Sequence, residues 1–185
     1  MHAEGGAVRR VASLEARTES FARAVVRPAL LTIGMYSRRA EHLLLGTAIQ
    51  ESGLTHRDQQ DGGPALGLFQ IEPATHDDIW ANYLEYRTDL APRVQTLLVS
   101  GPSRIEQLRN NDLYGAALAR VLYERTGRPL PAVADIDAHA SFWKEHYNTP
   151  RGQGEVDQYV ANWLRCFPVN AGPRRPRLRD RISRR

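Results

Sequence analysis

The alternation of apolar and polar positions along the chain predicts a protein built almost wholly of helices. In "SRRAEHLLLGTAIQES", Leu44, Ala48 and Glu51 fall on one face at three- and four-residue steps. Ser37 is a suitable N-cap for this helix, and Gly53 is a suitable C-cap. The pattern therefore predicts an amphipathic helix that places a carboxyl group on its apolar face, in its last turn.

Other segments carry similar patterns, separated by "GPS", "TGRPLP" and "NTPRGQG". They predict helices at about 73–85, 87–100, 111–126, 135–147 and 154–166. An N-terminal helix is expected from about Val8 to Arg27, ending at Pro28. Only the glycine-rich stretch 57–71 is typical of a small β-hairpin. The expected fold class is mainly α, with one hairpin.

Length and composition fit a single globular domain. The chain has 185 residues, of which 42% are hydrophobic and 25% charged, which is enough for a core of its own. Cys166 is the only cysteine, so an internal disulfide framework and a cysteine-based zinc cluster are excluded. The N-terminus lacks the pattern of a signal peptide, and no window is apolar enough to span a membrane, so we expect synthesis in the cytoplasm.

The positive charge of the chain is concentrated at its C-terminus. The formal net charge is +4, yet the last twelve residues, "RRPRLRDRISRR", hold seven arginines and one aspartate. The rest of the chain has 18 basic and 20 acidic residues and is slightly acidic. We expect residues 169–185 to form a solvated, disordered tail that could attach to anionic envelope surfaces or to nucleic acid. The acidic body makes nucleic acid the weaker choice.

Glu51 is the first candidate for chemistry. Burial on the apolar face and the negative end of the helix dipole would both raise the pKa of its carboxyl group. A carboxyl group that stays protonated near neutral pH is suited to general acid catalysis. The spacing alone fits a second interpretation equally well, in which Glu51 is half-exposed and "GLFQIEP" is an ordinary strand and turn.

Three motifs in order resemble the lytic transglycosylases and goose-type lysozymes of the lysozyme-like superfamily. They are "ES" at the helix end, "GLFQIEPAT" after a variable turn, and "YNTPRGQGEV" at 147–156. The resemblance covers about residues 34–167 and implies a lysozyme-like α+β fold with the hairpin beside an active-site cleft. The implied domains are an N-terminal helical arm (1–33), a catalytic domain (34–168) and the basic tail.

By position, the resemblance makes Glu51 the catalytic acid and Tyr147 a second catalytic residue, close enough to orient Glu51 or the N-acetyl group of the substrate. The other matched positions would contact the substrate: Ser52, Gly67, Leu68, Phe69, Gln70 and Asn148. Phe69 stands where Met is commoner, and "DQQDGGPAL" departs from the turn of many transglycosylases. Tyr147 has an alternative role as a core aromatic residue whose hydroxyl group satisfies a buried polar group.

The implied reaction is cleavage of the glycosidic bond between N-acetylmuramic acid and N-acetylglucosamine in peptidoglycan. Asp61 lies six residues before Gly67, as an aspartate does in goose-type lysozymes, and would hold a water for hydrolysis. Asp58 and Glu72 are alternative second carboxylates. Without such a water, Glu51 would act as a base and a 1,6-anhydro product would form.

No metal or organic cofactor is implied by the resemblance. The expected setting is a bacteriophage enzyme that acts at the bacterial cell wall, either as part of the virion or as a released endolysin. Two alternatives come from other classes of protein. One is a non-catalytic lysozyme-fold module that binds glycan strands or a virion partner, and the other is a nucleic-acid-binding protein that relies on the arginine tail.

Overall fold

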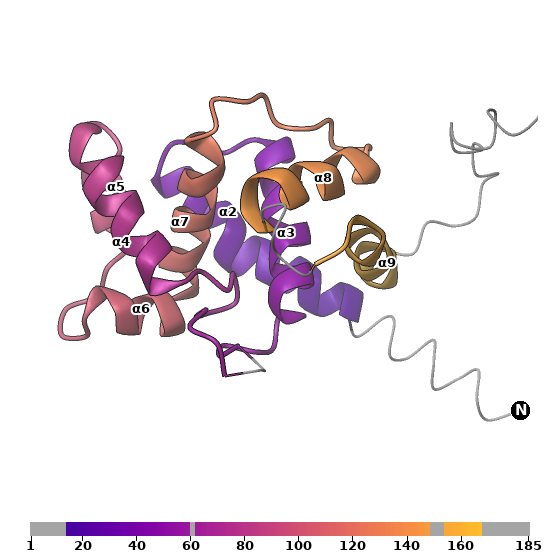
Figure 1. The fold of residues 1–185 in the computed structure, drawn as a ribbon, viewed down its shortest axis with the longest axis horizontal. Coiled ribbons are helices and arrows are strands. Elements are labelled where there is room, and N and C mark those ends of the chain that lie inside the picture. The colour runs from indigo at the N-terminus through magenta and orange to yellow at the C-terminus, as the bar shows by residue number, and fades with distance from the viewer. Residues whose placement is uncertain (1–13, 60–61, 149–153, 168–185) are drawn as a thin grey trace, which may run out of the picture.

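The structure is a computed structural model, which describes residues 14–59, 62–148 and 154–167 (Figure 1). Over these residues the protein is mainly helical, as predicted. Residues 14–21 are helical and continue into a π-helical segment. In chain order, the other elements are π-helical Ala22–Val26, α2 (Arg27–Thr32), α3 (Arg38–Ser52), α4 (Pro73–Asn82), 3₁₀-helical Leu84–Tyr86, α5 (Ala91–Gln95), α6 (Arg104–Asn110), α7 (Asp112–Glu124), α8 (Ile136–Trp143), π-helical Lys144–Asn148 and α9 (Val156–Cys166).

Helices α3 and α7 form the middle of the fold. In Figure 1, α4, α5 and α6 lie to one side of them, and α8 and α9 lie to the other. Helix α3 packs against α8 and α9, and α7 packs against α2, α4 and α6. The end of α3 is therefore placed between the two groups of helices.

Helix α3 begins and ends as its sequence predicts. The Ser37 hydroxyl group accepts a hydrogen bond from the backbone N–H of Ala40, at 3.1 Å. Gly53 adopts the left-handed conformation, with φ of 58°, and its N–H donates to the carbonyl oxygen of Ile49. Almost every position from 43 to 49 is buried, so α3 is a core helix and not a surface one.

Helix α7 can be surrounded on all sides because its middle is built from small residues. Its sequence, "DLYGAALARVLYE", is buried from Tyr114 to Val121. Neighbouring helices can approach closely because four of these residues are small: Gly115, Ala116, Ala117 and Ala119. Tyr114 and Tyr123 fill the larger spaces at the two ends of this stretch, and both are fully buried.

The N-terminal helix was predicted to end at Pro28, but it continues to Thr32. The residues before the proline are π-helical, and the N–H of Arg27 donates to the carbonyl oxygen of Ala22, five residues back. This wider turn accommodates Pro28, which has no backbone N–H to donate. In a regular helix its ring would also clash with the carbonyl group of the preceding turn. Val26, Ala29 and Leu30 are fully buried in the main core, so this part of the predicted arm packs with the rest of the protein.

Two other regions differ from the predicted pattern. Helix α6 was not predicted, although Ser103 and Glu106 form a reciprocal capping box at its start. The helix predicted at 87–100 is shorter and spans Ala91–Gln95. None of the helices described is both long and apolar enough to cross a membrane.

The connection between α3 and α4 has little regular structure. Within its described residues no strand forms, and isolated antiparallel bridges join Leu66 to Asp58 and to Ile71. The hairpin at 57–71 stays a prediction, because residues 60 and 61 lie outside the description. The arginine tail and Asp61 also lie outside it.

Candidate active site

A cleft of about 1200 Å³ lies at the C-terminal end of α3. Its walls come from the α3 end, the connection to α4, the start of α4, the end of α8 with the following turn, and α9. The predicted site residues that line it are Glu51, Ser52, Gln70, Tyr147 and Asn148. Segments that are about a hundred residues apart in the sequence thus meet at one hollow.

Glu51 supplies a carboxyl group to this cleft from the last turn of α3. The side chain is partly buried, and burial raises its pKa from 4.5 to about 7. Water stabilises a carboxylate anion far better than the protein interior does, so the neutral acid is favoured here. Burial therefore keeps a share of the Glu51 carboxyl groups protonated close to neutral pH.

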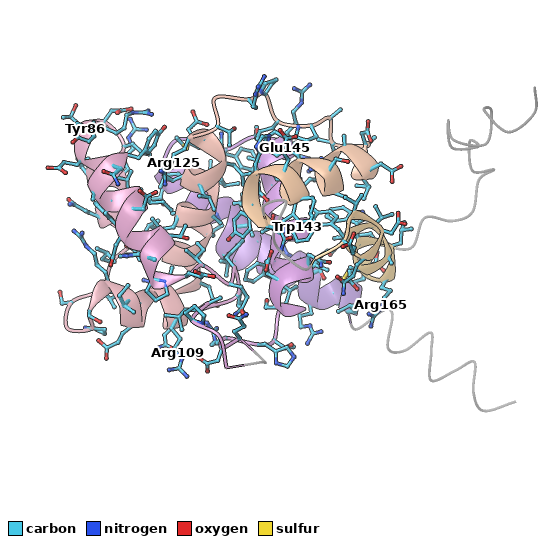
Figure 2. The ribbon with its side chains drawn as sticks, viewed as in Figure 1. Tyr86, Arg109, Arg125, Trp143, Glu145 and Arg165 are labelled. Atoms are coloured by element: carbon cyan, nitrogen blue, oxygen red, sulfur yellow. The ribbon has the colours of Figure 1, made fainter. Side chains whose placement is uncertain are left out.

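Trp143, the last residue of α8, holds the Glu51 carboxyl group in place. Its indole Nε1 donates a hydrogen bond of 2.8 Å to Oε1 of Glu51. This bond favours the carboxylate and opposes part of the pKa rise that burial causes. The ring is 1% exposed and packs on Tyr159, so the donor has little freedom to turn away. Figure 2 labels Trp143 beside α3, at the end of α8.

Gly154, just before α9, lies against the indole ring of Trp143. A Cβ atom at Gly154 would lie 2.4 Å from the Trp143 ring, too close for any other residue. The glycine of the sequence motif at 147–156 thus has a physical partner in Trp143. The link between its glycine and Trp143 supports the position of the donor to Glu51.

Tyr147 connects the π-helical segment after α8 to the segment "GLFQ" by a hydrogen bond. Its hydroxyl group donates a 2.7 Å hydrogen bond to the backbone carbonyl of Phe69. Burial raises the pKa of Tyr147 well above its usual range, and the nearby Glu51 carboxylate adds to the effect. This bond fits the alternative role of Tyr147, in which its hydroxyl group satisfies a buried polar group, and the catalytic role of Tyr147 stays a prediction.

The Phe69 side chain points into the core rather than into the cleft. It is 1% exposed and lies against Phe21, with ring centroids 6.1 Å apart. Leu68 is also buried. Both residues hold the "GLFQ" segment in the fold, and of its four residues only Gln70 lines the cleft.

Ser52 and Gly67 fix the path of the same segment. The Ser52 hydroxyl group donates to the backbone carbonyl of Leu68, at 2.8 Å, and joins the end of α3 to this turn. Gly67 has a φ of +73°, and a Cβ atom there would lie 2.3 Å from the carbonyl oxygen of Leu108. Gln70 also has a positive φ, of 47°, and its side-chain amide donates to the carbonyl of Gly67. The turn is thus tightly specified before any ligand binds.

Two of the predicted second carboxylates line the cleft. Asp58 forms an ion pair with Arg109, and Glu72 is exposed just before α4. Arg57 forms a two-pronged pair with Asp112 next to it, so this part of the connection is attached to the start of α7. Asp61 lies outside the described residues, and its predicted role is untested by the structure.

The opposite wall, formed by α9, is lined with amides. Asn162 donates to the side-chain oxygen of Gln50 at 2.9 Å, and Gln50 donates to Gln158 at 3.0 Å. Asn148 accepts a hydrogen bond from Lys144 at the base of this wall. No local pattern marks Gln50, Gln158 and Asn162 as site residues, because only the packing of α9 on α3 brings them together.

A second hollow, of about 730 Å³, lies between α4, α5 and α6. The guanidinium group of Arg104 covers the Trp80 ring there, 3.9 Å from its centroid. None of the predicted site residues lines this hollow. Within the described ranges, no three histidine, cysteine or acidic side chains gather closely enough to hold a metal ion.

Comparison of the chain with protein-family models, with curated proteins and with solved structures found no match.

Proposed function

We propose that this protein is a peptidoglycan-degrading glycosidase, either a muramidase or a lytic transglycosylase, in which Glu51 is the general acid. The observation that carries the proposal is the Glu51 carboxyl group, which lines a large cleft and has a pKa raised to about 7 by burial. Such a group can deliver a proton near neutral pH to the oxygen of a leaving sugar. The order of the motifs at the helix end, the "GLFQ" turn and the Tyr-Asn turn adds support from sequence.

In the first step, protonated Glu51 would donate its proton to the oxygen of the bond between N-acetylmuramic acid and N-acetylglucosamine. The C–O bond then breaks as positive charge develops on the sugar. Trp143 would hold the carboxyl group at a fixed position throughout, since its indole N–H can bond to the acid and to the carboxylate. Its bond is stronger to the carboxylate, so it also favours release of the proton.

The second step would decide the product. If a carboxylate holds a water on the opposite face of the sugar, hydrolysis follows. Asp61, Asp58 and Glu72 are the candidates, and Asp58 is already paired with Arg109. If no such water is held, the Glu51 carboxylate would take the proton of the 6-hydroxyl group of muramic acid, and a 1,6-anhydro ring would close. Both routes use Glu51 in the same first step.

The biological setting in this proposal is a bacteriophage protein that acts on the bacterial cell wall. It would be either a virion-associated enzyme or an endolysin. The arginine-rich tail would attach it to anionic envelope components through charge. The fold in this proposal is that of the lysozyme-like superfamily, of which the mainly helical architecture is the coarser part.

A second candidate function is a non-catalytic module that binds glycan strands. The amide-lined wall of α9 favours it, because side-chain amides can both donate to and accept from sugar hydroxyl and acetamido groups. Such a module would use the same cleft without needing a proton donor.

The test is mass spectrometry of the soluble muropeptides that the purified protein releases from bacterial sacculi, with Glu51→Gln alongside. Products that end in reducing muramic acid would identify a muramidase, and 1,6-anhydro ends would identify a transglycosylase. Glu51→Gln keeps an acceptor for the Trp143 bond but has no proton to give. We expect it to release at least about 100-fold less. Absence of release by the unmodified protein would overturn the enzyme proposal in favour of the binding module.

A further inference from the structure

The charges that line the cleft are divided between its two sides. Asp58 and Glu72 belong to the connection before α4, whereas Arg165 belongs to α9. Figure 1 places α4 and α9 on opposite sides of α3. Among the described residues that line the cleft, Arg165 is the only lysine or arginine. A ligand in the cleft would therefore meet acidic groups on one side and a guanidinium group on the other.

Arg165 is connected to the helix end that carries Glu51. Its Nη1 donates to Asn162 Oδ1 over a long contact of 3.4 Å, and Asn162 donates to Gln50, the neighbour of Glu51. The contact is too long to engage the guanidinium group strongly. Most of its five N–H donors stay available for another acceptor. Figure 2 labels Arg165 at the edge of α9.

We infer that Arg165 binds a carboxylate on the muramic acid side of the glycan strand and makes the cleft selective for muramyl glycans over plain N-acetylglucosamine polymers. This inference rests on the proposed function, which supplies the glycan as ligand. A guanidinium group is suited to a carboxylate, because two parallel N–H donors match its two oxygens. N-acetylglucosamine has no carboxylate, whereas a muramyl unit carries one either on its stem peptide or, once the peptide is removed, on its lactyl group.

The carboxylate has two possible sources on the same sugar. In an intact strand the lactyl group is joined to a stem peptide, and the free carboxylates belong to the peptide. Where the peptide has been removed, the lactyl group itself ends in a carboxylate. Both would present the same chemistry to Arg165, and defined ligands can separate them.

The experiment measures binding by calorimetry to the full-length Glu51→Gln variant, which cannot consume its ligand by acid catalysis. Three tetrasaccharides serve as ligands: a muramyl tetrasaccharide with stem peptides, the same compound after an amidase has removed the peptides, and chitotetraose. Arg165→Ala is added to the Glu51→Gln chain as the test. Arg39→Ala is the matched control, because Arg39 is an exposed arginine that does not line the cleft.

We expect Arg165→Ala to weaken binding of a carboxylate-bearing ligand about ten-fold, or about 1.4 kcal/mol, and to leave chitotetraose binding unchanged. A loss confined to the peptide-bearing ligand would assign the carboxylate to the stem. A loss confined to the amidase-treated ligand would assign it to the lactyl group. Arg39→Ala should change none of the three affinities.

Equal losses for all three ligands, or no loss for any of them, would overturn the inference. Failure of this inference is distinguished from failure of the proposed function by whether the unmodified protein releases muropeptides. If sacculi are cleaved while Arg165→Ala leaves binding unchanged, only the role of Arg165 fails. If none of the three glycans is bound and no muropeptide is released, both proposals fail.

Discussion

The indole N–H of Trp143 donates a 2.8 Å hydrogen bond to the carboxyl group of Glu51, from a position 92 residues further along the chain. Burial raises the pKa of Glu51, and this bond lowers it again in part. The proton affinity of the acid is therefore set by two opposed effects, of which one comes from a single side chain. That side chain can be changed without touching Glu51.

Trp143→Phe should move the alkaline limit of activity to higher pH and lower the maximal rate. The substitution removes the donor that stabilises the carboxylate, so the pKa of Glu51 rises above about 7 and the acid stays protonated further into the alkaline range. The rate falls because nothing then fixes the direction of the proton donor. The measurement is the rate of sacculus solubilisation from about pH 5 to about pH 9.

Trp163→Phe is the control for loss of a buried indole, since Trp163 packs in the core and does not line the cleft. It should leave the position of the alkaline limit unchanged. An alkaline limit that Trp143→Phe does not move would mean that this bond has no part in setting the proton affinity of Glu51.

Glu51→Gln should increase stability at alkaline pH while it abolishes activity. The folded-state pKa of about 7 is higher than the 4.5 of the free side chain, so the folded protein binds the proton more tightly than the unfolded chain does. Glu51 therefore lowers stability progressively as pH rises from 4.5 to 7, by about 3 kcal/mol in full. Urea unfolding should find the variant more stable than the unmodified protein at pH 8, with little difference below pH 4.5.

Glu85→Gln, at an exposed position, controls for the general effect of one fewer negative charge. It should give nearly the same stability as the unmodified protein at both pH values. If Glu51→Gln behaved like Glu85→Gln, the Glu51 carboxylate would not be desolvated in the folded state.

Features that depend on neighbouring residues could be predicted from the sequence. The start of α3 at Ser37, its end at Gly53 and the place of Glu51 on its buried side follow from capping chemistry and helical spacing. Helix α6 could have been found in the same way from Ser103 and Glu106. The prediction instead relied on repeating apolar positions, and a helix of seven residues is too short to show a clear repeat.

Features that depend on packing could not be predicted. The Trp143 ring has the spacing of a core residue, and nothing local marks its N–H as the partner of Glu51. The bond from Tyr147 to the Phe69 carbonyl likewise joins residues 78 apart. The helix end predicted at Pro28 was wrong for a related reason, because the wider turn before the proline, which lets the helix continue, has no local sign in the sequence.

Gly67→Ala should destabilise the protein far more than Gly127→Ala. Both glycines have a positive φ, of 73° and 63°, so an alanine at either position has a similar backbone strain of about 1–2 kcal/mol. Only at Gly67 would the new Cβ meet backbone, the carbonyl oxygen of Leu108 at 2.3 Å, whereas the space at Gly127 is open. We expect an additional loss of about 1–3 kcal/mol in urea unfolding for Gly67→Ala.

Equal losses for the two alanine variants would mean that the "GLFQ" turn can shift away from α6 at no cost. Activity gives a second readout, because a displaced turn would carry Gln70 out of the cleft. Gly127→Ala should leave the rate of sacculus solubilisation unchanged.

Two histidines, the buried His139 and the half-buried His42, should destabilise the fold in acid, and Glu51 masks part of this effect because its own trend with pH is opposite. Burial lowers the pKa of His139 to about 4 and also lowers that of His42, whose ring centroid lies 6.4 Å away. Arg38 and Glu41 act on His42, and Asp135 acts on His139, without reversing either shift. The unfolded chain therefore binds protons more tightly at these sites, and their contribution to stability is complete above pH 6.5 and lost as pH falls towards 4.

Glu51 has the opposite trend over much of the same range, so the histidine effect is best measured in the Glu51→Gln chain. There we expect stability to fall by about 2 kcal/mol between pH 6.5 and pH 4, and to fall clearly less when His139→Gln is added. A glutamine can still donate towards the Ala132 carbonyl that His139 Nε2 contacts at 3.1 Å. His56→Gln, at an exposed position, is the control and should leave the fall unchanged. An equally steep fall with His139→Gln would place the acid sensitivity in other groups.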